Sequence, residues 1–130
     1  MRTYSYDVRA VSHGATPDLR SLSEEMAREV AETMQALATP SRVRILSRLA
    51  GGECSVGVLA GDLGMEQSAV SQQLRILRHL GLVVGERSGR QIIYALHDDH
   101  VRDLLGEAVS HTEHRQLGLS ASPARQAIEA

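Results

Sequence analysis

The sequence predicts a mainly α-helical fold with one small β-hairpin, and three patterns between Ser55 and Leu96 support this prediction. The first two are short helical patterns on either side of Gly64, a residue suited to the left-handed turn between packed helices. The third is a pair of apolar stretches, rich in β-branched residues, around a glycine-containing turn. Two helices, a tight turn and a hairpin in this order predict a winged helix-turn-helix.

The N-terminal part of the chain predicts an arm followed by a helix. Residues 1–20 lack periodicity and contain Gly and Pro, so we expect a flexible arm there. Ser21 and Glu24 match a capping box, and a first helix is expected from there to about Ala38. Its apolar positions recur at helical spacing, and they are Leu22, Met26, Val30, Met34 and Leu37.

A second helix is expected from Pro40 to Ala50. Thr39 provides an N-cap side chain, and Pro40 suits the first helical position because no backbone N–H is needed there. Gly51 and Gly52 are expected to end this helix. The side chains expected to point into the core are Val43, Leu46 and Leu49.

The next two helical patterns differ in length and polarity. A short helix is expected over residues 56–63 and a longer one over residues 66–80, whose core-facing stripe is Val70, Leu74 and Leu77. No acidic residue occurs in residues 67–85, so this region can approach phosphate without repulsion. Gln and Arg side chains match the edges of adenine and guanine. We therefore predict a recognition helix for double-stranded DNA, with a contact face made of Gln67, Ser68, Ser71, Gln72 and Arg75.

A β-hairpin is expected after the recognition helix. Apolar residues 82–84 and the β-branched stretch 91–96 flank a polar turn. Arg87 and Arg90 lie near its tip, so the hairpin is expected to serve as a wing that contacts flanking phosphate. Either the polar helix face or the hairpin alone would also fit an ordinary solvated surface. Their succession in one segment favours DNA binding.

The charge of the chain is unevenly distributed, although the 130 residues carry a formal net charge of only −2. Residues 39–96 hold seven arginines against four acidic residues, a net +3, and both flanking segments are acidic. Only the local charge has to face phosphate, so the overall charge does not exclude DNA binding. Phe and Trp are absent, which disfavours single-stranded nucleic acid, because its binding needs aromatic stacking platforms.

The size and the cysteine content bound the class of protein further. We expect one domain, stabilised as a homodimer through the first and last helices. The lone Cys54 excludes an internal disulfide framework and is expected to be a small, partly buried filler. No apolar run reaches membrane length and no leader pattern is present, so we expect a cytoplasmic protein without a membrane partner.

The last helix is expected from Asp99 to about Arg115, with a flexible tail over residues 116–130. His100 and His111 share one face of this helix. Eleven residues at about 100° each turn the chain around the helix axis to within about 20° of the starting direction. At about 1.5 Å per residue they lie roughly 16 Å apart, so one helix cannot close a site with metal bonds of about 2 Å. The potential ligands on or beside this helix are Asp98, His100, His111 and His114.

Two antiparallel copies of this helix would close such a site. A two-fold axis near Gly106 would bring the two ligands at the start of one helix to the two at the end of its copy. Helical residues two apart do not face each other, so Asp98 has to lie at the N-cap, where the backbone is not yet helical. Nitrogen and oxygen ligands without thiolate suit zinc, cobalt or nickel. The alternative is a solvated helix that carries histidines by chance.

Three motifs resemble the ArsR/SmtB family of metal-responsive repressors over about residues 22–115, and they are ALATPSRVRIL, EQSAVSQQLRILRHLGLV and GERSGRQIIYAL. The resemblance implies a dimeric winged-helix protein that binds operator DNA without metal and releases it with metal. The pattern Asp-x-His…His-x-x-His looks like the interhelical site of the zinc, cobalt and nickel sensors in this family. It implies a metal site formed by Asp98, His100, His111 and His114.

The resemblance also narrows the choice of metal. The arsenic and cadmium branch has a Cys-Val-Cys box where this chain has Ser55 and Gly57, with Cys54 one place too early, so thiolate sensing is disfavoured. The chain is most similar to nickel and cobalt sensors, which take further ligands from the N-terminal arm or from beyond the last helix. Gln116 stands where such a sensor has a histidine, and His13 is the substitute candidate in the arm. Nickel or cobalt is therefore the expected effector, with zinc as the alternative.

Two other functions stay open on the sequence alone. A winged-helix regulator that senses no metal would bind DNA with metal-independent affinity. A small metallohydrolase would use the same Asp and His side chains, but the sequence offers no separate general base. We therefore expect a transcriptional repressor and not an enzyme, with its DNA-binding and dimerisation domain over residues 21–115.

Overall fold

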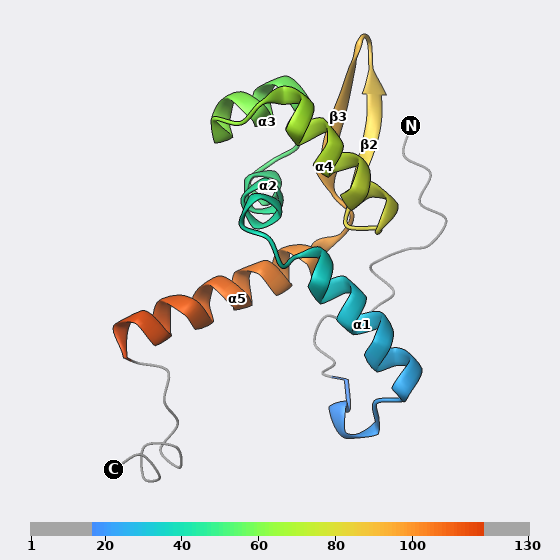
Figure 1. The fold of residues 1–130 in the computed structure, drawn as a ribbon, viewed down its shortest axis with the longest axis vertical. Helices are drawn as coiled ribbons and strands as arrows, with labels where there is room; N and C mark the ends of the chain where they lie inside the picture. Colours follow the sequence, from blue (N-terminus) through green and yellow to red (C-terminus); the bar gives the residue numbers. More distant parts are fainter. Residues whose placement is uncertain (1–16, 119–130) are drawn as a thin grey trace.

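The computed structural model describes residues 17–118, and Figure 1 shows how their helices and strands are arranged. The order of elements is α1 (Glu24–Ala36), α2 (Pro40–Ala50), β1 (Cys54–Ser55), α3 (Val56–Leu63), α4 (Gln67–His79), β2 (Val83–Ser88), β3 (Gln91–Leu96) and α5 (Asp99–Leu117). A mainly helical chain with one β-hairpin confirms the predicted fold class. In Figure 1, α3, α4 and the hairpin lie at one end of the molecule, and α1 and α5 lie at the other.

The predicted capping residues begin α2 and end α3, and Ser55, which was not predicted as a cap, begins α3. Thr39 Oγ1 accepts a hydrogen bond from the Arg42 N–H at 3.3 Å, and α2 starts at the proline that follows Thr39. Ser55 caps α3 by accepting a bond of 3.3 Å from the Val58 N–H. Gly64 ends α3 with φ of 64°, a left-handed conformation that glycine adopts without a Cβ penalty.

The start of α1 differs from the prediction. Ser23 is the N-cap in place of Ser21, and its Oγ accepts a hydrogen bond of 3.0 Å from the Met26 N–H. The Ser21 hydroxyl instead donates to Asp18 Oδ2 at 3.1 Å, within a single 3₁₀ turn that precedes α1. Because Asp18 engages the first of two competing serines, the second one caps the helix. The helix also ends earlier than expected, at Ala36.

The three strands form an antiparallel sheet in the order β1-β3-β2. Ser88 pairs with Gln91, so the hairpin loop has two residues, and its first residue, Gly89, has φ of 62°. Tight hairpin loops favour glycine at positions of positive φ. The sequence does not predict β1, because a strand of two residues has no periodicity. Its pairing of Cys54 with Tyr94 ties the start of α3 to the wing.

The core lies between α2, α3, α4 and the sheet. The prediction that Val43 points into it is wrong: Val43 is half-buried on the side of α2 that faces α5. The predicted positions Leu46 and Leu49 are buried, and Cys54 is 8% exposed, as a small filler should be. The largest fully buried side chains are Ile45, Leu46, Leu49, Leu59, Val70, Leu74, Leu77 and Val83.

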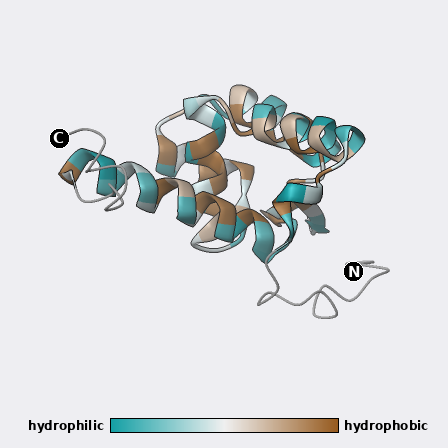
Figure 2. Ribbon diagram, turned by 90° about the horizontal axis from the view of Figure 1, so that it is seen from below, coloured by the Kyte–Doolittle hydropathy of each residue, from teal (hydrophilic) through white to brown (hydrophobic). Residues whose placement is uncertain are grey.

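The helix α5 leaves the body of the molecule as a long projection (Figures 1 and 2). Val101 and Leu105 near its start are buried, whereas every residue in 106–118 is exposed. In Figure 2 apolar residues gather in the middle of the molecule, and the projecting end of α5 is mostly hydrophilic. Apart from its chain neighbours and the backbone of its own helix, no atom of the described residues lies within 4 Å of the place a Cβ on Gly106 would take. Nothing within the described residues therefore explains a glycine at the centre of this helix.

Only small parts of the predicted arm and tail lie within the described residues. Helix α5 continues to Leu117, two residues into the expected tail, and Gly118 ends it with φ of 72°. The rest of the tail, and the arm up to residue 16 with His13, lie outside the described residues. Within residues 17–118, none of the helices combines the length and apolarity that spanning a bilayer requires.

Candidate DNA-binding surface and metal site

The predicted contact residues of the recognition helix share the outer face of α4. The inner face is anchored, because Val70, Leu74 and Leu77 are fully buried. Residues at spacings of three and four lie on one side of a helix, so the polar positions gather opposite this anchor. All five predicted residues reach the surface: Gln67, Ser68, Gln72 and Arg75 are exposed and Ser71 is half-buried.

The wing lies beside this helix at the same end of the molecule (Figure 1). Arg87 belongs to β2 and pairs in register with Ile92, and Arg90 is the second residue of the hairpin loop. Both arginines are exposed. Within the described part of the chain, the guanidinium groups of Arg75, Arg87 and Arg90 form no ion pair with an acidic side chain. They are therefore available to an external anion such as phosphate.

Three other arginines of the positive segment hold the helices together. Arg42 Nε donates to Gln73 Oε1 at 2.8 Å, which ties α2 to the recognition helix. Arg44 Nη2 donates to the Leu63 carbonyl oxygen at 2.8 Å. Arg48 Nε forms a 2.8 Å ion pair with Asp62. Three of the seven arginines counted in the sequence are therefore engaged in contacts between helices, and the other four, Arg75, Arg78, Arg87 and Arg90, are exposed.

Asp98 occupies the N-cap of α5, as the sequence predicts. Its backbone is extended, with φ of −158° and ψ of 177°, and Oδ1 accepts a hydrogen bond of 3.1 Å from the Val101 N–H. His100 Nδ1 lies 3.9 Å from the same Oδ1. Because Asp98 precedes the first helical residue, its side chain can reach toward His100 although the two residues are only two apart. The structure thus brings the first two predicted ligands together.

The pKa of the Asp98 carboxyl lies below its ordinary value. Burial alone would raise this pKa, since the side chain is only 17% exposed. Hydrogen bonds from His97, whose Nδ1 lies 3.0 Å from Oδ2, and from the Val101 N–H outweigh burial, and the charges of His97 and His100 act in the same direction. The carboxylate is therefore ionised at neutral pH, which is the form that binds a cation.

The other two predicted ligands lie on the projecting half of α5. His111 and His114 are both exposed. In residues 17–118 of one chain, no three His, Cys, Asp or Glu side chains are placed to hold one metal ion. The structure therefore places the predicted ligands as two separate groups, with Asp98 and His100 at the start of α5 and His111 and His114 in its last turns.

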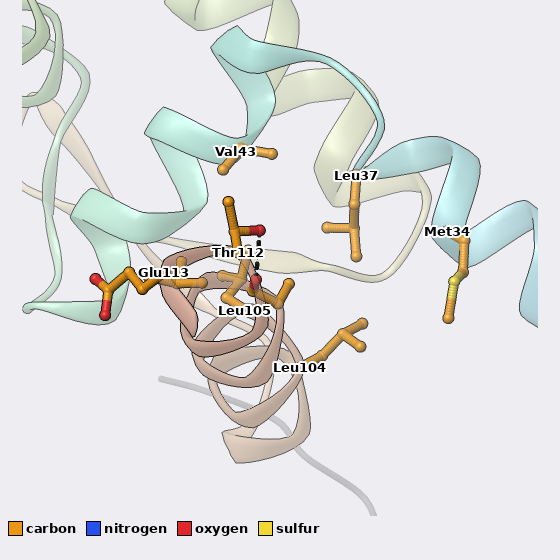
Figure 3. Close-up of a pocket in the computed structure, with 9 residues that line it drawn as sticks. Met34, Leu37, Val43, Leu104, Leu105, Thr112 and Glu113 are labelled. Atoms are coloured by element: carbon orange, nitrogen blue, oxygen red, sulfur yellow. Dashed lines mark hydrogen bonds between the residues drawn. The ribbon is translucent and has the colours of Figure 1, made fainter. Parts of the chain in front are cut away.

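An apolar groove borders the projecting helix. It has a volume of about 550 Å³ and runs between the end of α1, the start of α2 and α5. Figure 3 shows Met34, Leu37 and Val43 around this groove, with the side chains of α5 facing it. Thr112 Oγ1 is satisfied within its helix, because it donates to the Ala108 carbonyl oxygen at 2.9 Å. The α5 residues that line the groove are Leu104, Leu105, Ala108, Val109, Thr112 and Glu113.

The short α3, the anchored α4 with its exposed Gln and Arg side chains, and the hairpin beside them define a winged helix-turn-helix domain. The family model described as "Bacterial regulatory protein, arsR family" matches residues 39–84. The chain is also 60% identical to the HTH-type transcriptional regulator NmtR from Mycobacterium tuberculosis over 99 residues. These aligned residues make up 76% of this chain and 82% of that protein. The chain therefore belongs to the arsR family of bacterial regulatory proteins.

Solved structures and a second relative agree with this assignment. The solution structure of apo-NmtR matches with a TM-score of 0.66 and 53% identity, over 86% of this chain and 95% of that chain. A protein from Mycobacterium bovis is described as a homodimeric winged helix-turn-helix DNA-binding domain. It matches with a TM-score of 0.68 and 27% identity, over 80% of this chain and 99% of that chain. A transcriptional repressor SmtB homolog from Synechocystis sp. is 44% identical over 97 residues, 75% of this chain and 72% of that protein. Because these relatives are transcriptional regulators, the expectation of a regulator and not an enzyme is confirmed.

Proposed function

We propose that this chain is a homodimeric transcriptional repressor that binds operator DNA without metal and releases it when a divalent metal binds between its paired α5 helices. Nickel or cobalt is the proposed effector, and zinc is the alternative. Membership of the arsR family supports the regulatory role. The DNA site, the dimer and the metal site rest on the separate arguments that follow.

The proposed DNA contacts come from α4 and the wing. Gln67, Gln72 and Arg75 would face base edges in the major groove, where Gln pairs with adenine and Arg with guanine. Ser68 and Ser71 on the same face would add contacts to either bases or phosphate. Arg87 and Arg90 in the wing would bind phosphate on the flanking backbone. Their exposure, and the absence of ion pairs for the three arginines within residues 17–118, support this assignment.

The proposed dimer is supported by apolar surface at the α1 and α5 end. Met26 and Met34 on α1 are 48% and 54% exposed, and Val109 on α5 is 44% exposed. The apolar groove joins these surfaces. A single chain gains nothing from exposing them, whereas a second copy would bury them. The homodimeric description of the winged-helix relative from Mycobacterium bovis supports the same assembly.

The observation that carries the metal proposal is the placement of four donors in two groups around Gly106. Gly106 at the middle of α5 is exposed, and apart from its own helix nothing in the described residues lies within 4 Å of the place a Cβ would take, so a second α5 can approach closely there. An antiparallel α5 pair would place Asp98 and His100 of one subunit near His111 and His114 of the partner subunit. The donor set fits a divalent metal, since it offers one ionised carboxylate and three imidazoles.

The same donor set supports the choice of metal. Imidazole and carboxylate without thiolate suit zinc, nickel and cobalt. Cys54, the one cysteine of the chain, is buried and is not among the residues that line the groove, so it takes no part. The resemblance of the sequence to nickel and cobalt sensors favours these two metals, with His13 as the proposed further ligand.

Release of DNA would follow from the position of the metal site. When bound, the metal would join the α5 helices of both subunits and favour one relative orientation of the two α4 helices. Spacing of the recognition helices has to match the operator, so a changed orientation lowers affinity. Allosteric coupling of this kind is typically about 1–3 kcal/mol, or about 5- to 150-fold in affinity.

The proposal is tested by operator affinity with and without metal. A duplex selected from a random library by the metal-free protein serves as the probe, and its affinity is measured by fluorescence anisotropy. We expect nickel, cobalt or zinc to weaken binding at least fivefold for the wild-type protein. His100→Ala should keep the metal-free affinity and lose the metal effect, whereas His79→Ala, an exposed histidine outside α5, should keep the effect. A wild-type protein that ignores all three metals, or a His100→Ala protein that is still released, would contradict it.

A further inference from the structure

His97 contacts a proposed metal ligand without belonging to the predicted ligand set. It lies between β3 and α5, and its Nδ1 is 3.0 Å from Asp98 Oδ2. The His97 side chain is 23% exposed and the Asp98 side chain 17%, so water competes little for this contact. Both residues line a polar hollow of about 320 Å³ beside the start of α5. A shielded hydrogen bond of this length fixes the two groups relative to each other.

The backbone of His97 is held independently of its side chain. Its N–H donates to the Leu82 carbonyl oxygen at 2.9 Å, and the Leu82 N–H donates in turn to the Leu77 carbonyl oxygen at 2.9 Å. Leu77 belongs to the last turns of α4, and it is fully buried. The imidazole therefore approaches Asp98 from a fixed point on the core. Replacing the His97 side chain leaves both backbone bonds in place.

The Asp98 carboxylate is held at both oxygens. Oδ1 accepts the capping bond of 3.1 Å from the Val101 N–H, and Oδ2 faces His97 Nδ1 at 3.0 Å. One contact alone would leave the carboxylate free to rotate about χ2, because this torsion of Asp has a broad energy minimum. Two contacts fix its plane. The remaining lone pairs then have defined directions, as a carboxylate that binds metal requires.

We propose that His97 is a positioning residue for the metal site, which orients the Asp98 carboxylate through a hydrogen bond from Nδ1 and does not bind the metal itself. This inference rests on the proposed function. While Nδ1 keeps its hydrogen bond to Oδ2, Nε2 is the only ring nitrogen of His97 left for a metal, and an ion there would lie across the imidazole from Oδ2. Partners of this kind, which hold a ligand in place, typically contribute about 10- to 100-fold to metal affinity.

The test is a cobalt(II) titration of the full-length dimer followed by its visible ligand-field absorption. His97→Leu removes the donor and should weaken cobalt binding about tenfold or more, with unchanged band positions, intensities and stoichiometry at saturation. His97→Asn places an amide nitrogen where Nδ1 was and should bind within about threefold of wild type. His97→Gln carries its amide nitrogen one atom further out, so it should bind more weakly than the Asn variant. The Asn and Gln pair decides the question if the Leu variant does not fold.

Operator affinity of the metal-free proteins is the control, and it should be unchanged because the backbone bonds remain. Wild-type cobalt affinity in His97→Leu, or equal affinities of the Asn and Gln variants, would overturn the positioning role. Altered bands at saturation would show that His97 is a ligand and would also overturn it. In each of these results the wild-type protein binds cobalt, so the proposed function stands. If the wild-type protein binds no cobalt, both proposals fail together.

Discussion

The two ends of the molecule differ in how much of a functional site one chain contains. At the α4 end, the exposed contact face rests on a fully buried stripe of Val70, Leu74 and Leu77, so one subunit presents the whole face. At the α5 end, the proposed ligands form two groups on a helix whose outer half is exposed. The first surface therefore depends on the folding of one chain. The proposed metal site would depend on how two chains meet.

The largest expected effect comes from removing the anchor of the recognition helix. Leu74 is fully buried beneath the contact face, and Leu74→Ala should lower the free energy of unfolding by about 2–5 kcal/mol. Val58→Ala on α3, whose side chain is 50% exposed, is the control and should change it by less than about 0.5 kcal/mol. Urea unfolding of the metal-free protein measures both. Equal effects of the two substitutions would refute the anchored face.

Arg75 tests the contact face without disturbing its anchor. Arg75→Ala should weaken operator binding by about 1–3 kcal/mol, with or without metal, because the side chain is exposed and assigned to base readout. Arg20→Ala, an exposed arginine in the turn before α1, should leave affinity unchanged. Anisotropy titrations compare the two. A metal-dependent loss in Arg75→Ala would instead place this residue in the coupling between the two ends.

Asp98 tests the α5 end before any metal is added. Asp98→Ala removes the N-cap and should destabilise the metal-free protein by about 1 kcal/mol at neutral pH, whereas Asp98→Asn keeps a capping oxygen. The depressed pKa of Asp98 means that its carboxylate stabilises the fold above its unfolded pKa of about 3.9, and that this contribution is lost as pH falls through the lower folded pKa. Urea unfolding in the presence of a chelator at a series of pH values should show wild type losing its advantage over Asp98→Asn only below about pH 4. A pH-independent difference would contradict the pKa assignment.

The smallest expected effect belongs to the wing. Arg90→Ala removes one proposed phosphate contact at the tip of the hairpin, so it should weaken binding by less than about 1 kcal/mol and equally on any sequence. The slope of log affinity against log salt should fall by about 0.9 in magnitude, as expected for one lost phosphate contact. The slope is read from anisotropy titrations over a range of salt. An unchanged slope would remove Arg90 from the interface.

Local signals in the sequence predict most of the fold. Thr39 with Pro40, Gly64 and Asp98 each act on the backbone within a few residues, and the structure has all of them in the predicted roles. The prediction failed at Ser21, where two nearby serines compete for one helix end and Asp18 engages the first. Such a competition depends on a hydrogen bond that spacing does not reveal.

Long-range contacts could not be predicted from the sequence. Arg42 and Gln73 are 31 positions apart, and nothing in their spacing indicates that a hydrogen bond joins them. The two-residue strand β1 exists only through its pairing with β3. The proposed α5 ligands could be selected from the sequence because a two-fold axis adds a rule of its own, which compares positions around Gly106. The contact of His97 with Asp98 joins neighbours in sequence, yet only the structure shows that the side chains meet.

The central claim is that each metal site draws its ligands from both subunits, and mixed dimers test it most directly. One subunit carries His100→Ala and the other His111→Ala, with two different affinity tags so that only the mixed dimer is purified. In an antiparallel pair, both substitutions fall in the same site, and the second site keeps all four ligands. Each variant alone, as a homodimer, should bind cobalt(II) weakly.

The account predicts that the mixed dimer binds one cobalt(II) ion with the wild-type affinity and absorption spectrum. A site formed within each chain would leave both sites damaged in every dimer. A mixed dimer that binds no more tightly than its two parents would therefore contradict the claim that paired α5 helices form the site.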